Sequence, residues 1–386
     1  MKTAGCVCAL ILISSLAIAL PLDSPGGRRY TPGRRSRAPL SISFAGDIMA
    51  HSINYEMDDF AAIYRDIEYI LRHDDLSFGN LEFPMFPGTP QRSFPDFNVH
   101  PEYVEAAVYA GFDVFSVANN HVMDQGTGGV LSTLGEMERI GSELPYRIWI
   151  SGIKHREEEW TVTEIRMKGW KIGFAAVSQY SNTPPDRDLV RIVDYRKKGE
   201  RERFLRWVGE ESEKYDLFIL SYHGGVEYRR TPDPEKKAFF SALIDSGVDI
   251  LYGHHPHVLQ PVELVHTDEG EKIIFYSCGN LISGQNRIID PDLPWEDWSY
   301  TGDAAIFRIE VVDVGGMTSI GIKRPLLIGN VITPDRDVLI RPLETLAQAP
   351  LYGGWNEFYQ GRFEIMSSWV ERDFLIESGF PRPAPQ

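Results

Sequence analysis

Cysteine is scarce in this sequence. Three occur in 386 residues, and two of them, Cys6 and Cys8, lie in a leading segment that we expect to be removed. The remaining thiol, Cys278, cannot form a disulfide within the chain, so stability outside the cytoplasm would have to come from packing. A content of 43% hydrophobic and 12% aromatic residues is sufficient for a large core.

Positive charge is also in short supply. The chain has 39 Lys and Arg against 55 Asp and Glu, a formal net charge of -16. Nucleic-acid-binding domains usually carry a basic face, so we expect no nucleic-acid partner. No Gly-x-Ser-x-Gly follows a predicted strand, which leaves a serine hydrolase with little support. No repeat of fixed period is present, and solenoid folds are therefore disfavoured.

The apolar run at the N-terminus is too short for a membrane span. Ala9 to Leu20 offer about a dozen apolar residues, whereas a spanning helix needs about 20. Lys2 before the run and Ala17-Ile18-Ala19 at its end are typical of a signal peptide with a small-residue cleavage site. We therefore predict a signal peptide over residues 1–19 and an exported protein that is periplasmic, associated with the cell envelope or secreted.

The rest of the chain divides by composition. Residues 20–39 mix five arginines with Pro and Gly, which predicts a flexible linker; contact with acidic lipid or polymer is the functional alternative. Residues 40–330 form the predicted main domain. Residues 331–386 combine Pro-rich stretches with scattered aromatic residues, and we interpret them as a C-terminal appendage packed on that domain.

Strand and helix patterns alternate along the main domain. Leu40, Ile42 and Phe44 recur with the period of two that is typical of a strand. Further strands are predicted at 75–78, 112–117, 146–150, 160–166, 171–177, 217–221, 249–251, 262–265, 272–276 and 304–312, and helices at 57–73, 101–110, 129–140, 200–214 and 234–246. This order indicates a mainly parallel α/β architecture with antiparallel edges.

Short polar clusters directly follow the predicted strands. They are Gly46-Asp47, Asn80-Leu81-Glu82, Asn119-Asn120-His121, His223, Gly253-His254-His255-Pro256-His257 and Gly279-Asn280. The carboxyl ends of parallel strands meet at one edge of a sheet, so these clusters are expected to converge there.

Their side chains are typical metal ligands. His255 and His257, held by Pro256, offer imidazoles suited to Zn, Mn or Fe, although a His-rich surface turn is the alternative. Asp47, Glu82 and Asn120 would each add one oxygen, unless they only cap helices. His223 would be a further ligand or a core histidine, with Glu227 as a partner that fixes a histidine tautomer.

Other members of these clusters are candidates for proton transfer or support. His121 is a candidate proton donor, and Asp124, three residues later, could orient it or cap the next helix. The Asn pair before His121 could instead serve turn geometry. The remaining polar residues of the clusters would orient the ligands or bind substrate, and they are Asn80, Asn119, His254 and Asn280.

Together these segments resemble a known family. Gly46-Asp47-Ile48-Met49, Gly79 to Glu82, Ala118 to His121, His223 to Tyr228, Gly253 to Gln260 and Tyr276 to Asn280, in this order over residues 41–285, are similar to the capsule-synthesis CapA family, also called PGA_cap. That resemblance implies a calcineurin-like metallophosphatase fold, a four-layer α/β/β/α sandwich with mixed sheets. It also implies a role in poly-γ-glutamate capsule production.

The resemblance assigns the ligands residue by residue. Asp47 matches the first-strand aspartate of the superfamily, Asn120-His121 its Asn-His pair, His223 its lone histidine, and His255 and His257 its His-x-His element. Two positions depart from the phosphoesterase pattern. Met49 stands where those enzymes have a histidine, and Glu82 replaces the bridging aspartate. Ordinary phosphatase activity therefore does not follow from the resemblance.

Two functions from different classes remain. One is metal-dependent hydrolysis or transfer at a phosphoryl or amide bond, acting on a small phosphorylated or γ-glutamyl substrate. The other is a non-catalytic envelope protein that binds or guides an acidic polymer, alongside other capsule-synthesis proteins at the membrane. The first function depends on the pocket, and the second on the same pocket or on the Arg-rich linker. Asp47 has to lie within about 10 Å of His255 or His257 if direct coordination is to be feasible.

Overall fold

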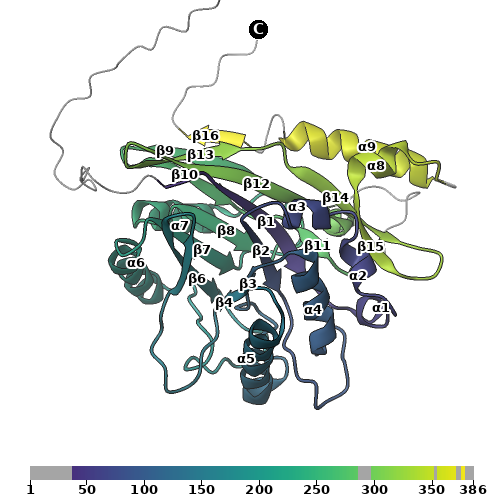
Figure 1. The fold of residues 1–386 in the computed structure, drawn as a ribbon, viewed down its shortest axis with the longest axis horizontal. Helices are drawn as coiled ribbons and strands as arrows, with labels where there is room; N and C mark the ends of the chain where they lie inside the picture. Colours follow the sequence, from purple (N-terminus) through teal and green to yellow (C-terminus); the bar gives the residue numbers. More distant parts are fainter. Residues whose placement is uncertain (1–36, 286–296, 352–353, 371–374, 379–386) are drawn as a thin grey trace, which may run out of the picture.

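The protein is an α/β fold built around one continuous, strongly curled set of strands (Figure 1). The computed structural model describes residues 37–285, 297–351, 354–370 and 375–378. Within these residues, none of the helices combines the length and the apolar character that a membrane span requires. The predicted signal peptide, residues 1–19, and the predicted linker up to residue 36 lie outside the described residues.

One half of the strand set is parallel, with one antiparallel neighbour. Its order is β4 (Trp149–Ser151), β3 (Val114–Ser116), β2 (Leu76–Leu81), β1 (Leu40–Ile48) and β12 (Asp303–Val314). β12 runs antiparallel to β1, and the short β11 (Asn280–Ile282) pairs with the end of β1. All nine residues of β1 are buried or half-buried, because both faces of this central strand are covered.

The other half is also mainly parallel, with an antiparallel strand at its edge. Its order is β10 (Gly270–Phe275), β8 (Ile250–His254), β7 (Leu217–His223), β6 (Trp170–Ser178) and the antiparallel edge strand β5 (Thr163–Met167). β9 (Val262–Thr267) forms a hairpin with β10, and β16 (Leu375–Ser378) pairs with β9. β13 (Met317–Ile322) pairs with both β12 and β10 and so joins the halves.

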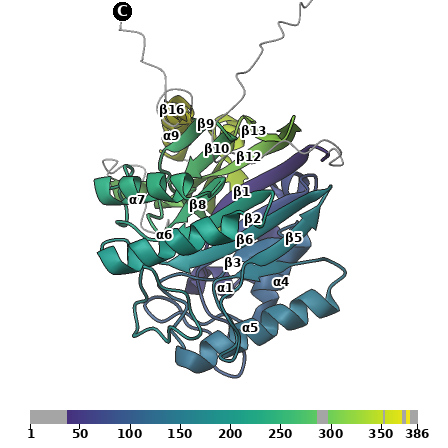
Figure 2. The same cartoon turned by 90° about the vertical axis from the view of Figure 1, so that its left-hand side faces the viewer.

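The two halves pack face to face. Phe44 of β1 stacks on Phe78 of β2 at 4.9 Å between ring centroids, and Phe78 meets Phe174 of β6 at 5.2 Å. A second apolar cluster lies between the first half and α4 (Pro101–Ala110) and α5 (Gly126–Glu143). A third lies between the other half and α6 (Lys198–Ser212) and α7 (Pro234–Asp245) (Figure 2). The predicted α/β/β/α sandwich with mixed sheets is confirmed.

The predicted helix over residues 57–73 is wrong. The structure has α1 (Ser52–Tyr55), α2 (Ala61–Tyr64) and α3 (Glu68–Leu71), each of one turn. Ile67 between α2 and α3 has φ -120°, outside the helical range, so the helical spacing of apolar residues is kept without a continuous helix. Ile63, Ile67 and Ile70 are all buried in the outer apolar cluster, so the apolar spacing reflects their burial rather than a long helix.

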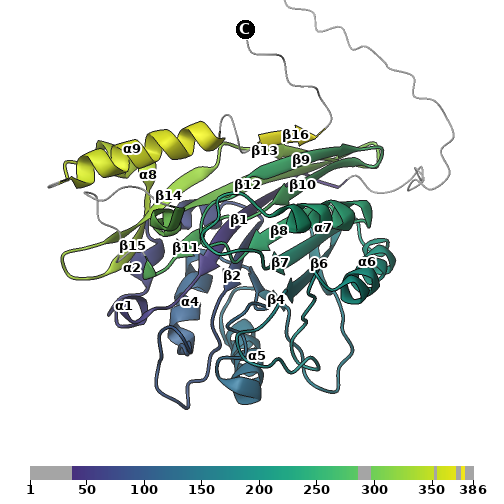
Figure 3. The ribbon, with the colours of Figure 1, turned by 180° about the vertical axis from the view of Figure 1, so that it is seen from behind.

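The C-terminal part is continuous with the main sheet. β14 (Leu326–Ile332) pairs with β12, β15 (Val338–Pro342) pairs with β14, and α8 (Leu343–Gln348) and α9 (Trp355–Ser368) cover β14 (Figure 3). The 3₁₀-helix η2 (Asp297–Gly302) precedes β12. The buried Arg362 of α9 donates from Nε to Asp303 Oδ2 at 2.6 Å. β14 therefore runs through the boundary predicted at residue 330.

Arg37, predicted as part of the flexible linker, is instead folded into the domain. Its side chain is 7% exposed and pairs with Asp216 at 2.6 Å and Asp313 at 3.1 Å. Its guanidinium also lies over the Trp170 ring, 4.7 Å from the centroid. Composition predicted a solvated tether, but three partners from separate strands and loops hold this residue.

Candidate metal centre

The carboxyl ends of the parallel strands meet, as their register requires. Asp47 of β1 lies opposite Asn80 of β2 and Asn280 of β11. In the other half, Ser178, His223 and His254 are neighbours across β6, β7 and β8. The close approach of the two halves at this edge brings Asp47 into contact with the histidine turn that follows β8.

Glu82 lies at the centre of the resulting cluster. Its side chain is fully buried, and neither carboxylate oxygen has a hydrogen-bond partner among the described residues. Oε1 is 3.6 Å from His223 Nε2 and 3.7 Å from His257 Nε2. A buried carboxylate without partners is costly, so this geometry favours a bound cation between these side chains.

Two groups of potential ligands share Glu82. One consists of Asp47, Glu82 and His257, and the other of Glu82, His223 and His255, with the ligand atoms of each group within 4.8 Å of one another. Asn120 adjoins the second group, because its Oδ1 is 2.7 Å from His223 Nε2. A third group, Glu227 with His255 and His257, includes an exposed carboxylate.

Neighbouring side chains occupy one carboxylate oxygen of Asp47 and leave its other oxygen free to bind a metal. Asn80 Nδ2 and His254 Nδ1 both donate to Asp47 Oδ1, each at 2.9 Å. The other oxygen, Oδ2, is therefore available, 3.4 Å from His257 Nδ1. Asn80 also lies close to His223, with its Nδ2 3.3 Å from Nδ1 of that ring.

The two ligand histidines of the turn after β8, His255 and His257, are each oriented by a hydrogen bond to one ring nitrogen. His257 Nδ1 donates to Asn280 Oδ1 at 3.0 Å, which directs Nε2 toward Glu82. His255 Nε2 contacts the hydroxyl of Tyr180 at 2.9 Å, and its Nδ1 has no hydrogen-bond partner in the described part of the chain. Hydrogen bonds of this kind commonly fix the tautomer and orientation of metal-binding imidazoles.

The turn that carries these histidines has an uncommon backbone. His255 has φ +93° and His257 has φ +58°, a region that residues with a Cβ seldom adopt. Gly253 just before the turn lies against β10, and an added Cβ there would be 2.4 Å from the carbonyl oxygen of Tyr276. Such local strain persists where the surroundings fix it, and it is common at functional sites.

The charges of the cluster are unbalanced. Burial by itself would raise the pKa of Asp47, but hydrogen bonds and charge from His254 and His257 hold that pKa well below its usual value. Burial, together with the nearby carboxylates of Asp47, Glu227 and Asp124, raises the pKa of Glu82 well above its usual value despite His257.

The imidazoles differ among themselves. Burial and the neighbouring His255 hold the pKa of His223 well below its usual value, and burial with His257 does the same to His255. Burial also opposes charge on His257, but Glu82 and Asp47 raise its pKa to about 9. Neutral His223 and His255 suit coordination, and the positive charge that Asp47 and Glu82 draw onto His257 is one that a divalent cation would replace.

His121 lies beside this cluster and is held by three groups. Its Nδ1 is 2.7 Å from Asp124 Oδ2, its backbone N–H donates to Asn119 Oδ1, and its ring packs edge to face on Phe97 at 4.7 Å. Asp124 also accepts from the Phe97 N–H, and burial raises the pKa of this carboxyl. Asn119 holds the loop by donating to the Leu81 carbonyl at 2.7 Å.

The structure thus brings all the predicted site residues to one end of the sandwich, although Glu227 is exposed at the margin. Met49, in place of a histidine, is buried in the outer apolar cluster and offers no nitrogen or oxygen ligand. The remaining donor set of carboxylate, imidazole and amide fits one or two divalent transition-metal ions.

The sequence analysis missed Tyr180 and Asn182. Asn182 Nδ2 lies 3.4 Å from both ring nitrogens of His121, and its Oδ1 accepts from Asn120 at 3.4 Å. Both residues follow the predicted strand 171–177, so the rule that polar residues after parallel strands converge would have found them. Residues 178–183 contain no histidine or acidic residue, so this strand end lacks the ligand types that mark the others.

Comparisons with known proteins show the family. The family described as "Bacterial capsule synthesis protein PGA_cap" matches residues 41–285. The PGA biosynthesis protein CapA of Bacillus subtilis (strain 168) is 27% identical over 332 residues, 78% of this chain and 79% of that protein. The capsule biosynthesis protein CapA of Bacillus anthracis is 27% identical over 298 residues, 73% of this chain and 66% of that protein.

A solved structure is also similar. The crystal structure of a hypothetical protein from Thermus thermophilus aligns with a TM-score of 0.42 and 18% identity, covering 75% of this chain and 98% of that one. The family match spans well over half of the chain and contains every candidate ligand described above. The chain therefore belongs to the bacterial capsule synthesis PGA_cap family.

Proposed function

We propose that this protein acts in the synthesis of a poly-glutamate capsule polymer and contains a two-metal site that hydrolyses or transfers phosphoryl or amide bonds. The polymer is suggested by the curated relatives, which are described as PGA and capsule biosynthesis proteins. The observation that carries the metal site is Glu82, a buried carboxylate with two unpartnered oxygens, among the described residues, that is shared by two ligand groups.

The chain's own residues would divide the work as follows. Asp47 and His257 would hold one ion, Asn120, His223 and His255 would hold the other, and Glu82 would be available to both. Bound divalent ions at such a site lower the pKa of a coordinated water and polarise the scissile group. Mn, Zn and Fe all suit this mixture of nitrogen and oxygen ligands.

His121 would handle the leaving group. Its Nδ1 is held by Asp124, so Nε2 is the atom that carries a proton to the substrate. Phe97 and Asn119 restrict the ring and its backbone, which keeps Nε2 in a fixed direction. A general acid in such a position contributes on the order of 10²–10⁴ in rate.

A non-catalytic role is the second candidate, and one observation favours it. Met49 removes a nitrogen ligand from the first ion's group, which leaves that group with three protein side chains. In this case the metal would bind the polymer without cleaving it. Deleting residues 20–36, which spares Arg37, and measuring polymer retention separates the contribution of the Arg-rich segment from that of the pocket.

We also propose that the protein works outside the cytoplasm. The support is the apolar run from Ala9 to Leu20 with the small residues at its end. N-terminal sequencing of the protein from a periplasmic or culture fraction tests this proposal. A mature chain that starts near residue 20 would agree with it, and a full-length cytoplasmic chain would contradict it.

Elemental analysis followed by activity assays tests the metal-site proposal. We expect about two equivalents of one transition metal per chain and metal-dependent turnover of a phosphodiester, phosphomonoester or γ-glutamyl substrate. Less than half an equivalent after reconstitution with Mn, Zn and Fe would rule out the site. Two equivalents without turnover on all three substrate classes would favour the non-catalytic role.

A further inference from the structure

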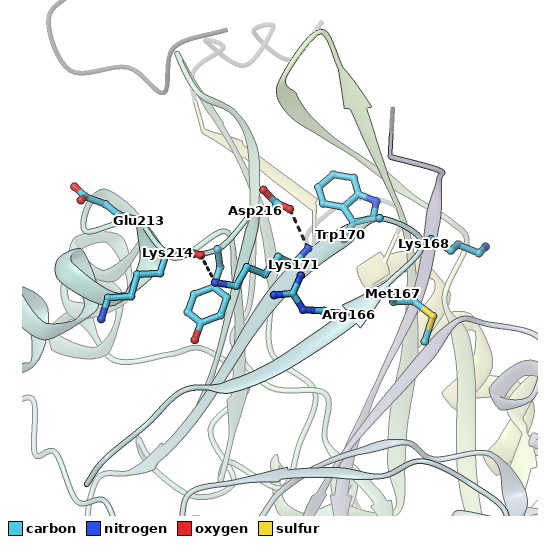
Figure 4. Close-up of a pocket in the computed structure, with 10 residues that line it drawn as sticks. Arg166, Met167, Lys168, Trp170, Lys171, Glu213, Lys214 and Asp216 are labelled. Atoms are coloured by element: carbon cyan, nitrogen blue, oxygen red, sulfur yellow. Dashed lines mark hydrogen bonds between the residues drawn. The ribbon is translucent and has the colours of Figure 1, made fainter. Parts of the chain in front are cut away.

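One cavity away from the candidate metal centre is lined by several basic side chains, but their charges are already paired. It has a volume of about 510 Å³ and lies at the amino ends of β6 and β7, where Figure 4 shows Arg166, Lys168, Lys171 and Lys214. Arg166 pairs with Glu164, Lys168 with Asp75 and Lys214 with Glu211, each at 2.7 Å. Lys171 pairs with Glu164 at 3.3 Å. These cations leave little unbalanced charge for a ligand.

A second cavity is different. It has a volume of about 330 Å³ and lies between α6 and the segment that leads from Arg187 to Val193, with Trp160 on its rim. Its lining combines aromatic side chains with three arginines. The cavity is of the size typical of small-molecule sites.

Arg191 is the central feature of this cavity. Its guanidinium stacks on the Trp207 ring, 3.4 Å from the centroid, with Trp160 and Phe204 each at 5.4 Å. Within the described residues this guanidinium has no hydrogen bond or ion pair, although burial lowers its pKa only to about 10 and leaves it charged at neutral pH. The close contact with Trp207 restricts the orientation of the guanidinium plane.

The charges around Arg191 do not cancel. Arg187 pairs with Glu200 at 3.3 Å, and Glu200 also accepts from the backbone N–H of Asp194 at 3.1 Å. Arg203 has no ion pair in the described part of the chain. Three arginines and one glutamate line the cavity, and Glu211 is a further carboxylate whose charge acts on Arg191. The lining is therefore positively charged on a chain whose formal net charge is -16.

From this arrangement we propose that the Arg191 cavity binds a carboxylate group of an acidic ligand, with the aliphatic part of the ligand against Trp160 and Trp207. A planar carboxylate matches the paired N–H donors of a guanidinium in a bidentate contact, and the stacked ring already restricts that donor plane. A half-buried cation without an ion pair among the described residues is stabilised when such a partner is present.

The cavity lies on the same edge of the sandwich as the candidate metal centre. The carbonyl of Arg191 accepts from the Ser178 N–H at 3.0 Å, and Ser178 is the β6 neighbour of His223. A chain of glutamyl units carries one free carboxylate per unit, so such a polymer could occupy both places. That identification of the ligand rests on the proposed function, whereas the carboxylate site itself does not.

Calorimetric titration of the full chain, dialysed free of metal and chelator, tests the site. The probe is a trimer of γ-linked glutamate, and the matched probe without carboxylates is the same trimer with every carboxyl group converted to a primary amide. We expect the glutamate trimer alone to bind, with at least tenfold weaker affinity in Arg191→Lys, which keeps the charge and loses the planar fork. Arg203→Gln, an exposed change that leaves the fold alone, should weaken binding several-fold.

Three controls decide the interpretation. Arg206→Gln alters an exposed arginine on the same helix that does not line the cavity, and it should change affinity less than twofold. Asp47→Asn should lose metal but keep trimer binding, which separates this site from the metal centre. The proposal is wrong if Arg191→Lys binds the trimer as tightly as the unchanged protein, or if Arg206→Gln weakens binding as much as Arg191→Lys does. It is also wrong if tripolyphosphate binds more tightly than the trimer, or if the trimer does not bind at millimolar concentration.

Discussion

Replacing Glu82 by Gln should abolish metal-induced stabilisation while leaving the metal-free protein almost unchanged. Burial and neighbouring carboxylates raise the pKa of Glu82, so a charge on this side chain is unfavourable in the metal-free fold. Gln has nearly the same shape and carries no charge. The free energy of unfolding without metal should therefore change by no more than about 1 kcal/mol.

The metal-bound protein should respond very differently. A site at 100 times its Kd contributes about 2.7 kcal/mol, so two sites contribute about 5 kcal/mol. At roughly 2 °C per kcal/mol for a chain of this size, the melting temperature should rise by about 10 °C. Because Glu82 belongs to both ligand groups, Glu82→Gln should reduce this rise to about 2 °C or less.

Thermal melts followed by circular dichroism, with and without Mn²⁺ or Zn²⁺, measure this difference. Glu227→Gln is the matched control, because it makes the same chemical change at an exposed carboxylate near His255 and His257. It should retain most of the metal-induced rise. If Glu227→Gln loses the rise and Glu82→Gln keeps it, the ions are held by the outer group, and the reasoning from the buried carboxylate is wrong.

Three further changes test other parts of the structure. Gly46→Ala should lower the free energy of unfolding by at least about 3 kcal/mol, because its Cβ would lie 1.9 Å from the Gly279 carbonyl oxygen. Gly135→Ala is the control at a helical site with no atom within 4 Å, and it should raise the free energy of unfolding by up to about 1 kcal/mol. Urea unfolding measures both changes. Burial raises the pKa of Asp113 to about 7, so its contribution to stability is complete below about pH 4 and is lost as the pH rises through 7. Asp113→Asn should therefore flatten the pH dependence of unfolding between pH 4 and 7 by up to about 4 kcal/mol, and identical profiles would contradict the shift. His121→Gln should keep the metal content and lower turnover by roughly 10²–10⁴, so full turnover would exclude it as the proton donor.

The strand ends were predictable because they combine two independent signals. Each ligand follows an apolar run with strand periodicity, and the carboxyl ends of parallel strands must share an edge. His223 and the turn around His255 therefore reach Glu82 from distant parts of the sequence without any long-range information. The helix α4, predicted at its observed bounds of 101–110, has Pro at its first position and Gly111 just beyond its end.

Other features depended on tertiary contacts that local patterns do not encode. Residues 57–73 have helical spacing of apolar residues but form only one-turn helices, because packing of α2 against α4 and β15 determines the backbone conformation there. Arg37 belongs by composition to a Pro- and Gly-rich segment, yet ion pairs with Asp216 and Asp313 fold it into the domain. Tyr180 follows a predicted strand, as the ligands do, but neither residue type signals its contact with His255, 75 positions away.

The anchoring of Arg37 also sets a direction for the whole molecule. β1 leads from the neighbourhood of this double ion pair to Asp47, and its nine residues span about 30 Å. A force applied on the N-terminal side of Arg37 would meet the ion pairs first and would load the central strand lengthwise, where many hydrogen bonds share it. The Arg37 ion pairs and the candidate metal ligands therefore lie at opposite ends of one strand.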